Sequence, residues 1–533
     1  MIFVRSNSKF IALTTSLLLI SASPAFAATP SVIYMESTNV NVTLTPFLTA
    51  GDLVGSYVVP GIPDGFGAEK LPDGNLRLIT NHEWSASNTV AAGRNSANGS
   101  SGGSFMSEAI YNPKTGEVES MTDFIREIVW YDYIKDDHSN APKGPFGAAA
   151  KDSFGTENHS RLLNRFCSAT LTDSDMFFDA KSGLGYKGSV FLAGEEGGDE
   201  SRAFAGNMDG QLVQLPRIGL ASWENLVPAD IKSKTTVIMG MEDGSAIDSQ
   251  LWMYRGTKTK TGEWYDRAGL NNGSPYVLAA GSIANDNAFR SSVGKNKPID
   301  VTFEKVDWKA TGLNQNNQAR EVGMEFARVE DGHFDPNKPN DFYFVTTESN
   351  KDSRATAANP ATPTVSRDGG GLWRLRFVDA SAPAKGATLE LLLDGSEAPY
   401  LSKPDNITVD EAGNVLIQED PGNNAAIARI VAYNIKTQQV GTIAKFKNEY
   451  FENGAAKFIT QDEESSGIIE VTNLLKKGKK DTARYYMFVA QIHSTPAKAR
   501  PDLDPASSWL PLAVEGGQWY VMKVTDWNSI YTS

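Results

Sequence analysis

The stretch VDEAGNVLIQED, residues 409–420, has the pattern of a β-hairpin whose second strand ends in two carboxylates. Its turn contains a glycine, which supplies the positive φ that tight hairpin turns require, and alternating apolar residues flank the turn. Other β-hairpin patterns lie at LPDGNLRLIT from Leu71, YNPKTGEVESM from Tyr111, NMDGQLVQL from Asn207, YRGTKTKTGEW from Tyr254 and YNIKTQQVGTI from Tyr433. This many hairpins without long helices between them predict an all-β fold and favour a β-propeller.

Long insertions separate the hairpins, and no repeat in the sequence shows the blades directly. A large β-sandwich and a pair of barrels are therefore alternatives to the propeller. Short helices are expected at Ser160–Arg165 and at Ile468–Lys476, where acidic residues precede an apolar run. No linker divides the chain after residue 27, so residues 28–533 are predicted to form one β-propeller domain with insertions.

Residues 1–27 have the pattern of a cleaved signal peptide. Arg5 and Lys9 precede an apolar run, and Ala25-Phe26-Ala27 is a small-x-small cleavage site. We therefore expect an exported protein, either periplasmic or extracellular. No later segment reaches about 18 uninterrupted apolar residues, so no membrane span is expected.

The acidic balance limits the possible partners. The chain carries a formal net charge of −14, and loss of Arg5 and Lys9 with the signal brings it to −16 (−14 minus 2). Such a charge argues against a nucleic acid or an anionic membrane as a partner. An anionic small-molecule substrate would need bound cations to offset the acidic surface. The sequence leaves the oligomeric state open.

Three apolar strands run directly into paired carboxylates. They end at Glu195-Glu196, at Glu242-Asp243 and at Glu419-Asp420. One such pair is typical of a solvated strand end, but in a radial arrangement three strand ends converge on one axis, where the acids would share bound cations. Asp405 in SKPDNITVD precedes the strand that ends at Asp420 and offers further oxygen ligands, although this motif also fits an Asx-turn.

The stretch REVGMEFARVEDGHFDP, residues 320–336, places Arg328 between Glu325 and Glu330. A guanidinium presents a planar fork that matches two phosphoryl oxygens, whereas carboxylates alone repel that anion unless cations neutralise them. The stretch therefore predicts a phosphate site beside metal ligands, with Arg328 as the catalytic residue. A solvated acidic loop is the alternative interpretation.

Other polar strand ends are weaker signals. Asn81-His82-Glu83 follows a strand, but a histidine that caps its own backbone explains this trio as well. Gln491 and His493 end another apolar strand and are candidates to line the same opening. Glu463 and Glu464 are also typical of a helix start.

The single cysteine, Cys167, cannot form an internal disulfide. Either burial as a small hydrophobe or metal coordination would protect it from oxidation. The chain has only five histidines, and it lacks HExxH, paired CxxC, P-loop and GxSxG motifs. Oxygen ligands predominate among the candidates, which favours calcium.

Taken in order, the motifs resemble those of the PhoX-type alkaline phosphatases. They are NHE from Asn81, FCS from Phe166, GEEGGDESRAF from Gly194, the strand into Glu242-Asp243, FARVEDGHFDP from Phe326, KPDNITVDEAGNVLIQED from Lys403, and DEESSG followed by FVAQIHS near the end. The resemblance implies a six-bladed β-propeller with a few short helices. It also implies hydrolysis of phosphate monoesters at a cluster of several calcium ions and ferric iron in the propeller mouth.

The resemblance implies a role for each matching residue. Arg328 would hold the phosphoryl oxygens, and the metal ligands would be Cys167 for iron together with Glu195 or Glu196, Asp243, Glu330, Asp405 and Asp420. The chain departs from the family pattern at Val329, where the family has proline, and its signal lacks a twin arginine. Two other functions stay open: a calcium-dependent propeller lactonase or esterase, and a non-catalytic propeller stabilised by calcium.

Overall fold

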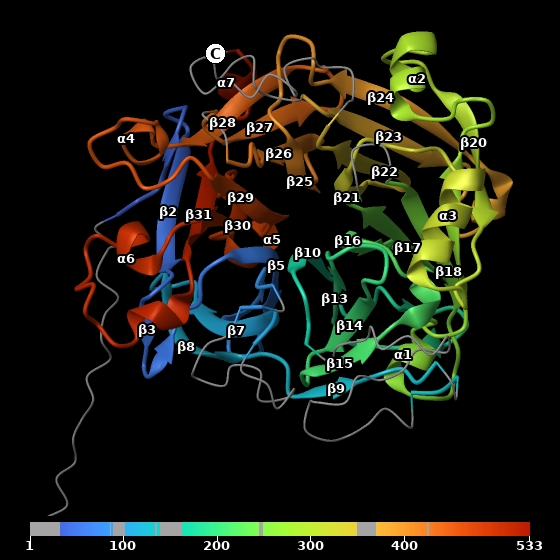
Figure 1. Ribbon diagram of the computed structural model, residues 1–533, viewed down its shortest axis with the longest axis horizontal. Coiled ribbons are helices and arrows are strands. Elements are labelled where there is room, and N and C mark those ends of the chain that lie inside the picture. Colours follow the sequence, from blue (N-terminus) through green and yellow to red (C-terminus); the bar gives the residue numbers. More distant parts are fainter. Residues whose placement is uncertain are drawn as a thin grey trace, which may run out of the picture.

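The strands form six antiparallel blades that radiate from a central axis (Figure 1). The structure is a computed structural model that describes residues 32–85, 87–88, 102–133, 136–138, 162–244, 249–348, 369–423 and 426–532. The predicted signal peptide lies outside these residues. The six-bladed β-propeller is confirmed, and the sandwich and paired-barrel alternatives are wrong.

In each blade the strands follow one another from the axis outward. Blade 1 contains β5 (Pro63–Lys70), β6 (Leu76–His82), β7 (Phe105–Asn112) and β8 (Glu117–Asp123). Blade 2 contains β10 (Phe166–Leu171), β13 (Val190–Glu195), β14 (Ala203–Asn207), β15 (Gln211–Gln214) and a parallel strand, β9 (Glu127–Val129). Blade 3 contains β16 (Trp223–Pro228), β17 (Thr235–Glu242), β18 (Leu251–Thr257), β19 (Ser274–Ala279) and β20 (Ile299–Lys305).

The other three blades follow the same plan. Blade 4 contains β21 (Val329–Asp335), β22 (Lys338–Thr346), β23 (Gly371–Phe377) and β24 (Ala387–Asp394), and β24 also pairs with β20 of blade 3. Blade 5 contains β25 (Pro404–Val409), β26 (Asn414–Glu419), β27 (Arg429–Asn434), β28 (Val440–Phe446) and β1 (Met35–Ser37). Blade 6 contains β29 (Glu463–Glu470), β30 (Arg484–Ile492), β31 (Gly516–Val524) and β2 (Val42–Thr49).

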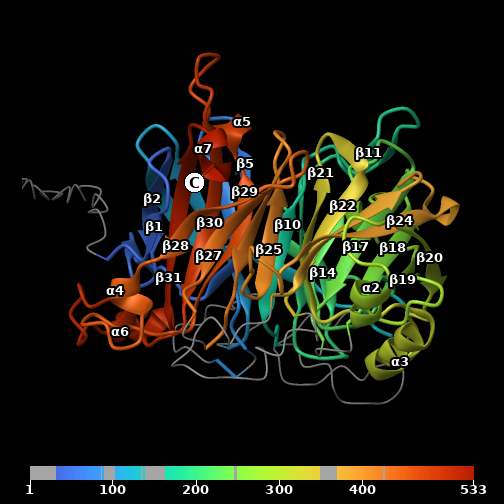
Figure 2. The same cartoon turned by 90° about the horizontal axis from the view of Figure 1, so that it is seen from above.

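Short elements decorate the blades. They are the strand pairs β3 (Leu53–Val54) with β4 (Tyr57–Val58) and β11 (Phe178–Asp179) with β12 (Leu184–Gly185), and the helices α1 (Trp264–Arg267), α2 (Asp286–Ser292), α3 (Gly312–Val322), α4 (Asn448–Phe451), α5 (Thr472–Leu475), α6 (Pro496–Ala499) and α7 (Asn528–Tyr531). Figure 2 shows the propeller from the side, with α2 and α3 at its edge. No helix within the described ranges is long and apolar enough to cross a membrane.

The two ends of the chain close the ring. The early strand β2 pairs with β31, so blade 6 combines one N-terminal strand with three C-terminal strands. The inner strands β5, β10, β16, β21, β25 and β29 contact one another in a closed circle around the axis. Because β2 completes the sheet of the last blade, strand pairing holds the N-terminal part of the chain against the C-terminal part.

Hydrophobic clusters lie between every pair of neighbouring blades. Blades 1 and 2 pack through residues such as Ile79 and Phe191, and blades 3 and 4 pack through residues such as Met239 and Phe344. Four further clusters fill the remaining junctions. The alternating apolar residues of the hairpins therefore face neighbouring blades and leave the axis to polar residues.

Five of the six predicted hairpins are confirmed, namely those from Leu71, Tyr111, Asn207, Val409 and Tyr433. The tight hairpin from Tyr254 is wrong, because α1 is inserted between the paired strands β18 and β19. The helix predicted at Ile468–Lys476 is confirmed only in part, and the helix predicted at Ser160–Arg165 is wrong over its described residues. Leu162–Arg165 is not helical, and Ile468–Glu470 ends the strand β29, where pairing with β30 overrides local helix propensity and leaves only α5 helical.

Close packing around the axis is visible at Gly65 in β5. A Cβ atom built there would lie 2.4 Å from the backbone nitrogen of Ala169 in β10. The neighbouring strand can yield only if its backbone moves. Gly65 therefore sets the spacing of the first two inner strands.

We predict that Gly65→Ala lowers the free energy of unfolding by about 1–3 kcal/mol, because it overpacks two backbones. Gly206→Ala is the control, since the atom nearest to its added Cβ would belong to the Phe124 ring, at 3.3 Å, and this side chain can shift. Urea unfolding of both variants measures the difference. Equal stability of the two variants would contradict the proposed close contact.

Candidate metal centre

The six inner strands place a polar side chain at the same position. The second residues of these strands are Asp64, Cys167, Glu224, Glu330, Asp405 and Glu464. The first residue of each inner strand pairs with the last residue of the second strand, as in Pro63↔His82. The residues that follow the second strands, among them Glu83, Glu196, Asp243, Asp420 and His493, therefore reach the same end of the axis. We call this end the mouth.

A β-bulge follows the mouth residue in every blade. In blade 1 the register moves from Pro63↔His82 to Phe66↔Thr80, so the inner strand has one extra residue. Blades 2 to 5 shift at the equivalent position, and blade 6 shifts slightly later, between Ser466 and Ile469. A bulge bends a strand and re-aims its side chains, which brings these residues to the axis.

The two adjacent carboxylates at each strand end have different partners. The first acid of each pair binds its own blade: Glu195 accepts hydrogen bonds from Arg202 at 2.6 Å, Glu242 from Trp252 Nε1 at 2.7 Å, and Glu419 from Arg429 Nε at 2.8 Å. The second acid of each pair is Glu196, Asp243 or Asp420. These second acids follow the strand and lie at the mouth.

Five overlapping groups of potential ligands encircle the axis. Within each group the ligand atoms lie within 4.8 Å of one another. The groups are Asp64-Glu83-Cys167, Cys167-Glu196-Glu224, Glu224-Glu330-Asp405, Asp405-Asp420-Glu464 and Glu464-Glu83-His493. Each group shares one residue with the next, and the last returns to Glu83. Together they form a closed ring, which we call the ligand ring.

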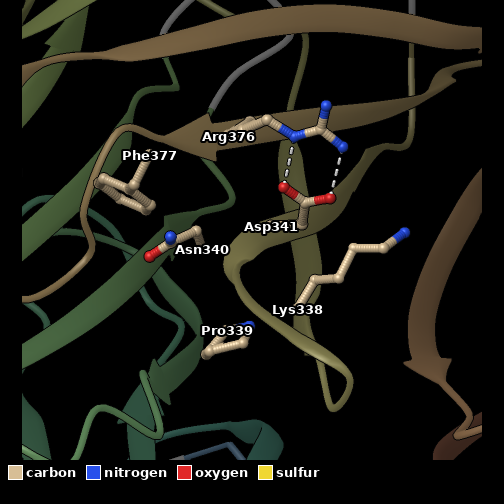
Figure 3. Close-up of a pocket in the computed structure, with 6 residues that line it drawn as sticks. All are labelled: Lys338, Pro339, Asn340, Asp341, Arg376 and Phe377. Atoms are coloured by element: carbon tan, nitrogen blue, oxygen red, sulfur yellow. Dashed lines mark hydrogen bonds and ion pairs between the residues drawn. The ribbon is translucent and has the colours of Figure 1, made fainter.

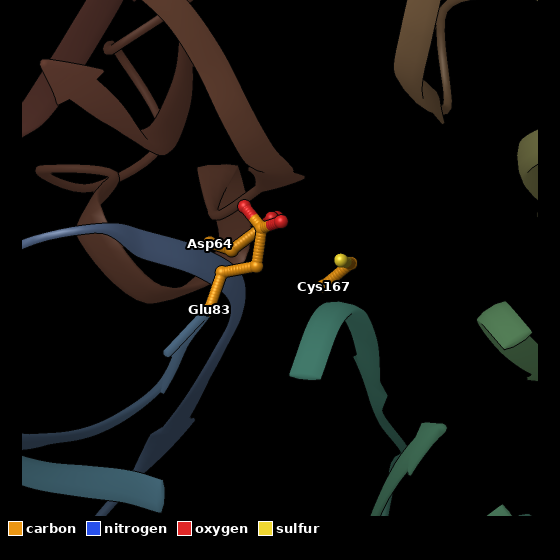
Figure 4. Close-up of side chains that lie close together, drawn as sticks. All are labelled: Asp64, Glu83 and Cys167. Carbon is orange, nitrogen blue, oxygen red and sulfur yellow. The ribbon is translucent and has the colours of Figure 1, made fainter. Parts of the chain in front are cut away.

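Figure 4 shows one part of the ligand ring. The carboxylates of Asp64 and Glu83 meet on the side of blade 1, and Cys167 faces them from β10 of blade 2. Gln491 Nε2 donates to Asp64 Oδ2 at 3.0 Å and to Glu83 Oε2 at 3.2 Å. Asp64 Oδ1 is buried and has no hydrogen-bond partner among the described residues.

Burial and mutual repulsion disfavour the charged forms of these acids. Burial, followed by neighbouring carboxylates, raises the pKa values of Asp64, Glu224 and Glu464 well above their ordinary range. Burial also raises the pKa of Glu196 to about 8, against the opposing effect of Arg165. Bound cations would offset this crowding and permit full ionisation.

The donor set fits metal ions. Carboxylate oxygens predominate and suit calcium, and an unpaired oxygen such as Asp64 Oδ1 is available for coordination. Cys167 and His493 add sulfur and nitrogen, which suit a transition metal such as iron. Burial raises the pKa of the Cys167 thiol, so a cation would be needed to hold it as thiolate.

Two arginines and a lysine enter the mouth from equivalent backbone positions. Ile62, Arg165, Arg328 and Lys403 each lie two residues before a ring residue, and all have positive φ between 44° and 62°. Arg328 donates to both oxygens of Asp243 at 2.7 Å, and its guanidinium lies 3.3 Å from Glu330. Arg165 contacts Glu83 and Glu196, and Lys403 Nζ lies 3.5 Å from Glu348. Non-glycine residues rarely adopt this conformation, so its recurrence marks a feature of the mouth.

A second polar layer lies directly below the ligand ring. Asp331 accepts hydrogen bonds from Asn225 Nδ2 at 2.6 Å and from the backbone nitrogen of Ile407 at 3.1 Å. These contacts connect blades 3, 4 and 5. Each residue follows or lies close to a ring member in sequence, so this layer holds the ligands of three blades at a fixed spacing.

The structure brings most of the predicted site together. Cys167, Glu196, Glu330, Asp405 and Asp420 lie in the ligand ring. Arg328 and Asp243 lie beside it as an ion pair. Glu195 instead forms a buried ion pair with Arg202 inside blade 2, so Glu196 is the candidate ligand of the two.

Several ring members were missed or only partly recognised in the sequence. Asp64 stands in a turn-like PDG motif, Glu224 is a single acid, and Glu464 was also consistent with a helix start. The NHE trio contributes Glu83, whereas His82 is buried between Gly61 and Ser107. Asp64, Glu224 and Glu464 share one signal, the position after the first residue of an inner strand, and this signal can be read only when the strand boundaries are known.

A separate cavity lies at the opposite end of blade 4. It has a volume of about 340 Å³ and is lined by Lys338, Pro339, Asn340, Asp341, Arg376 and Phe377. Asp341 and Arg376 pair in two hydrogen bonds of 2.6 Å (Figure 3). Because β22 runs from Lys338 to Thr346 at the mouth, this cavity is remote from the ligand ring.

Known proteins resemble this chain in sequence and in fold. The family described as "Alkaline phosphatase PhoX" matches residues 217–482, which include Glu224, Arg328, Glu330, Asp405 and Glu464. No curated protein matches the chain. The solved structure of Pseudomonas fluorescens PhoX in complex with vanadate, a transition state analogue, is similar with a TM-score of 0.58 and 11% identity, over 95% of this chain and 98% of that one.

Two other solved structures are similar at lower TM-scores. The catalytic domain of Coprinopsis cinerea GH62 α-L-arabinofuranosidase has a TM-score of 0.33 at 10% identity, covering 93% of this chain and 98% of that chain. A luciferin-regenerating enzyme has a TM-score of 0.30 at 11% identity, covering 87% and 91%. The chain is therefore a member of the PhoX-type alkaline phosphatase family or a divergent relative of it.

Proposed function

We propose that this protein is an exported, metal-dependent phosphatase that hydrolyses phosphate monoesters in the propeller mouth. The observation that carries the proposal is the closed ligand ring with Arg328 beside it. The family match supports an alkaline phosphatase-type function and a small-molecule substrate. The proposal of export rests on the signal-like pattern of residues 1–27.

The ligand ring would hold several calcium ions, with iron beside Cys167. The oxygen-rich groups Glu224-Glu330-Asp405 and Asp405-Asp420-Glu464 suit calcium, and the groups that contain Cys167 or His493 suit iron. When bound, these cations would neutralise the carboxylates and polarise phosphoryl oxygens. The second polar layer around Asp331 keeps the ligands in place beneath them.

Arg328 is positioned to bind the phosphoryl group. Asp243 accepts hydrogen bonds from Nε and Nη2 of Arg328, both at 2.7 Å, and thereby fixes the plane of the guanidinium. The remaining nitrogen, Nη1, lies 3.8 Å from Glu348 Oε1, and we assign this side of the guanidinium to phosphoryl oxygens. A fixed cation beside the ligand ring would stabilise the negative charge that develops during phosphoryl transfer.

The direct test compares three chromogenic substrates: a phosphate monoester, a phosphate diester and a lactone. We expect the monoester to be hydrolysed fastest, a chelator to abolish the activity, and purified protein to contain calcium and iron. Preference for the lactone would instead support a calcium-dependent esterase. Full phosphatase activity in metal-free protein would overturn the proposal.

We predict that Arg328→Ala reduces kcat for a phosphate monoester about 10²–10³-fold, as expected when one stabilising donor is removed. Metal content and melting temperature should stay close to those of the unaltered protein. Arg126→Ala, at an exposed position outside the mouth, is the control and should keep full turnover. Unchanged kcat in the Arg328 variant would remove this residue from the mechanism.

The adjacent acids Glu195 and Glu196 allow a matched comparison. Glu196→Gln removes a ring carboxylate, so metal content and activity should fall. Glu195→Gln breaks a buried ion pair with Arg202 and should lower the free energy of unfolding by about 3–5 kcal/mol, while the folded protein retains metal. Elemental analysis and urea unfolding distinguish the two. The reverse result would show that the roles of these residues are exchanged.

A further inference from the structure

Arg165 occupies the same backbone position in blade 2 that Arg328 occupies in blade 4. Each lies two residues before a ring member, with φ of 44° for Arg165 and 62° for Arg328. Each also contacts the acid that follows the second strand of the preceding blade, Glu83 for Arg165 and Asp243 for Arg328. Arg165 is therefore a second guanidinium held at the mouth by the same local geometry.

The cations are distributed unevenly around the ligand ring. Arg328 and Lys403 come from neighbouring blades and both contact Glu348, at 3.8 Å and 3.5 Å. Arg165 stands apart on blade 2, where it contacts Glu83 and Glu196. The mouth therefore has one cationic position beside Arg328 and another beside Arg165.

Arg165 is the more accessible of the two guanidinium groups. Its side chain is 44% exposed, compared with 28% for Arg328, although it contacts two carboxylates of the ligand ring. Cations bound by Glu83 and Glu196 would partly neutralise those carboxylates. The guanidinium of Arg165 would then be able to attract another anion. The planar fork of arginine matches carboxylate and phosphate groups equally well.

We propose that Arg165 forms a second anion subsite, and that the preferred substrates are phosphate monoesters with a second anionic group. The scissile phosphoryl group would lie on the side of Arg328, and the second group, a carboxylate or phosphate of the leaving part, would lie against Arg165. This inference rests on the proposed phosphatase function. It assigns Arg165 to substrate specificity and leaves the chemical step to the Arg328 side of the mouth.

Two matched substrate pairs test the proposal on the metal-loaded enzyme. Glycerol phosphate and phosphoglycerate differ by a carboxylate, and fructose monophosphate and fructose bisphosphate differ by a phosphate. In Arg165→Gln we expect kcat/KM to fall about tenfold for the substrates with a second anion, mainly through KM, and less than about twofold for their partners. A fall confined to one pair identifies the second anion as carboxylate or phosphate.

Arg376→Gln is the matched control, because Arg376 is also half exposed and pairs with a carboxylate, in the remote cavity of blade 4 (Figure 3). It should leave all four kcat/KM values unchanged. Arg165→Lys keeps the charge without the fork and should retain part of the preference if Arg165→Gln folds poorly. Metal content is measured in each variant.

An equal loss of kcat/KM on all four substrates would overturn the proposal, since it would make Arg165 a structural counter-ion for Glu83 and Glu196. Unchanged preferences in both Arg165 variants would also overturn it. An unaltered enzyme that hydrolyses neither these four substrates nor the chromogenic monoester would refute the phosphatase function itself, whereas hydrolysis of the chromogenic monoester alone would refute only the second anion subsite. The two failures are therefore distinguishable.

Discussion

Repulsion among buried carboxylates around the propeller axis is the constraint on which the structure depends. Every blade contributes at least one polar residue to the mouth, and the ring brings their ligand atoms within 4.8 Å of one another in five overlapping groups. Burial and neighbouring acids raise the pKa values of several members, so the charged ring is unfavourable without cations. The hydrophobic clusters between the blades hold the acids together in spite of this cost.

The fold resolves the crowding by giving neighbouring acids different partners. Glu195 and Glu419 bind arginines of their own blades, whereas Glu196 and Asp420 lie at the mouth. One residue along a strand reverses the direction of a side chain, so adjacent acids cannot both face the axis. The acid that stays in the blade strengthens the strand end from which the other acid projects.

The backbone repeats around the axis, but the side chains do not. Four blades share the left-handed conformation two residues before the ring, yet the residues there are Ile62, Arg165, Arg328 and Lys403. A symmetric ring of acids would bind cations and little else. The asymmetric placement of three cationic side chains gives the mouth distinct sides, one of which we assign to the phosphoryl group and another to the rest of the substrate.

The sequence by itself determined the β-hairpins, the all-β class and the convergence of acids at strand ends, because turn residues and apolar alternation act locally. Resemblance to a known family also predicted roles for Cys167, Arg328 and Glu330, which lie at or beside the ligand ring. The sequence could not separate Glu195 from Glu196, or recognise Asp64, Glu224 and Glu464, because their roles depend on strand register and on bulges that form only when neighbouring strands pair. Only the tertiary structure decided which acids meet at the axis, since closure of the ring by β2 and β31 brings together residues from every part of the chain.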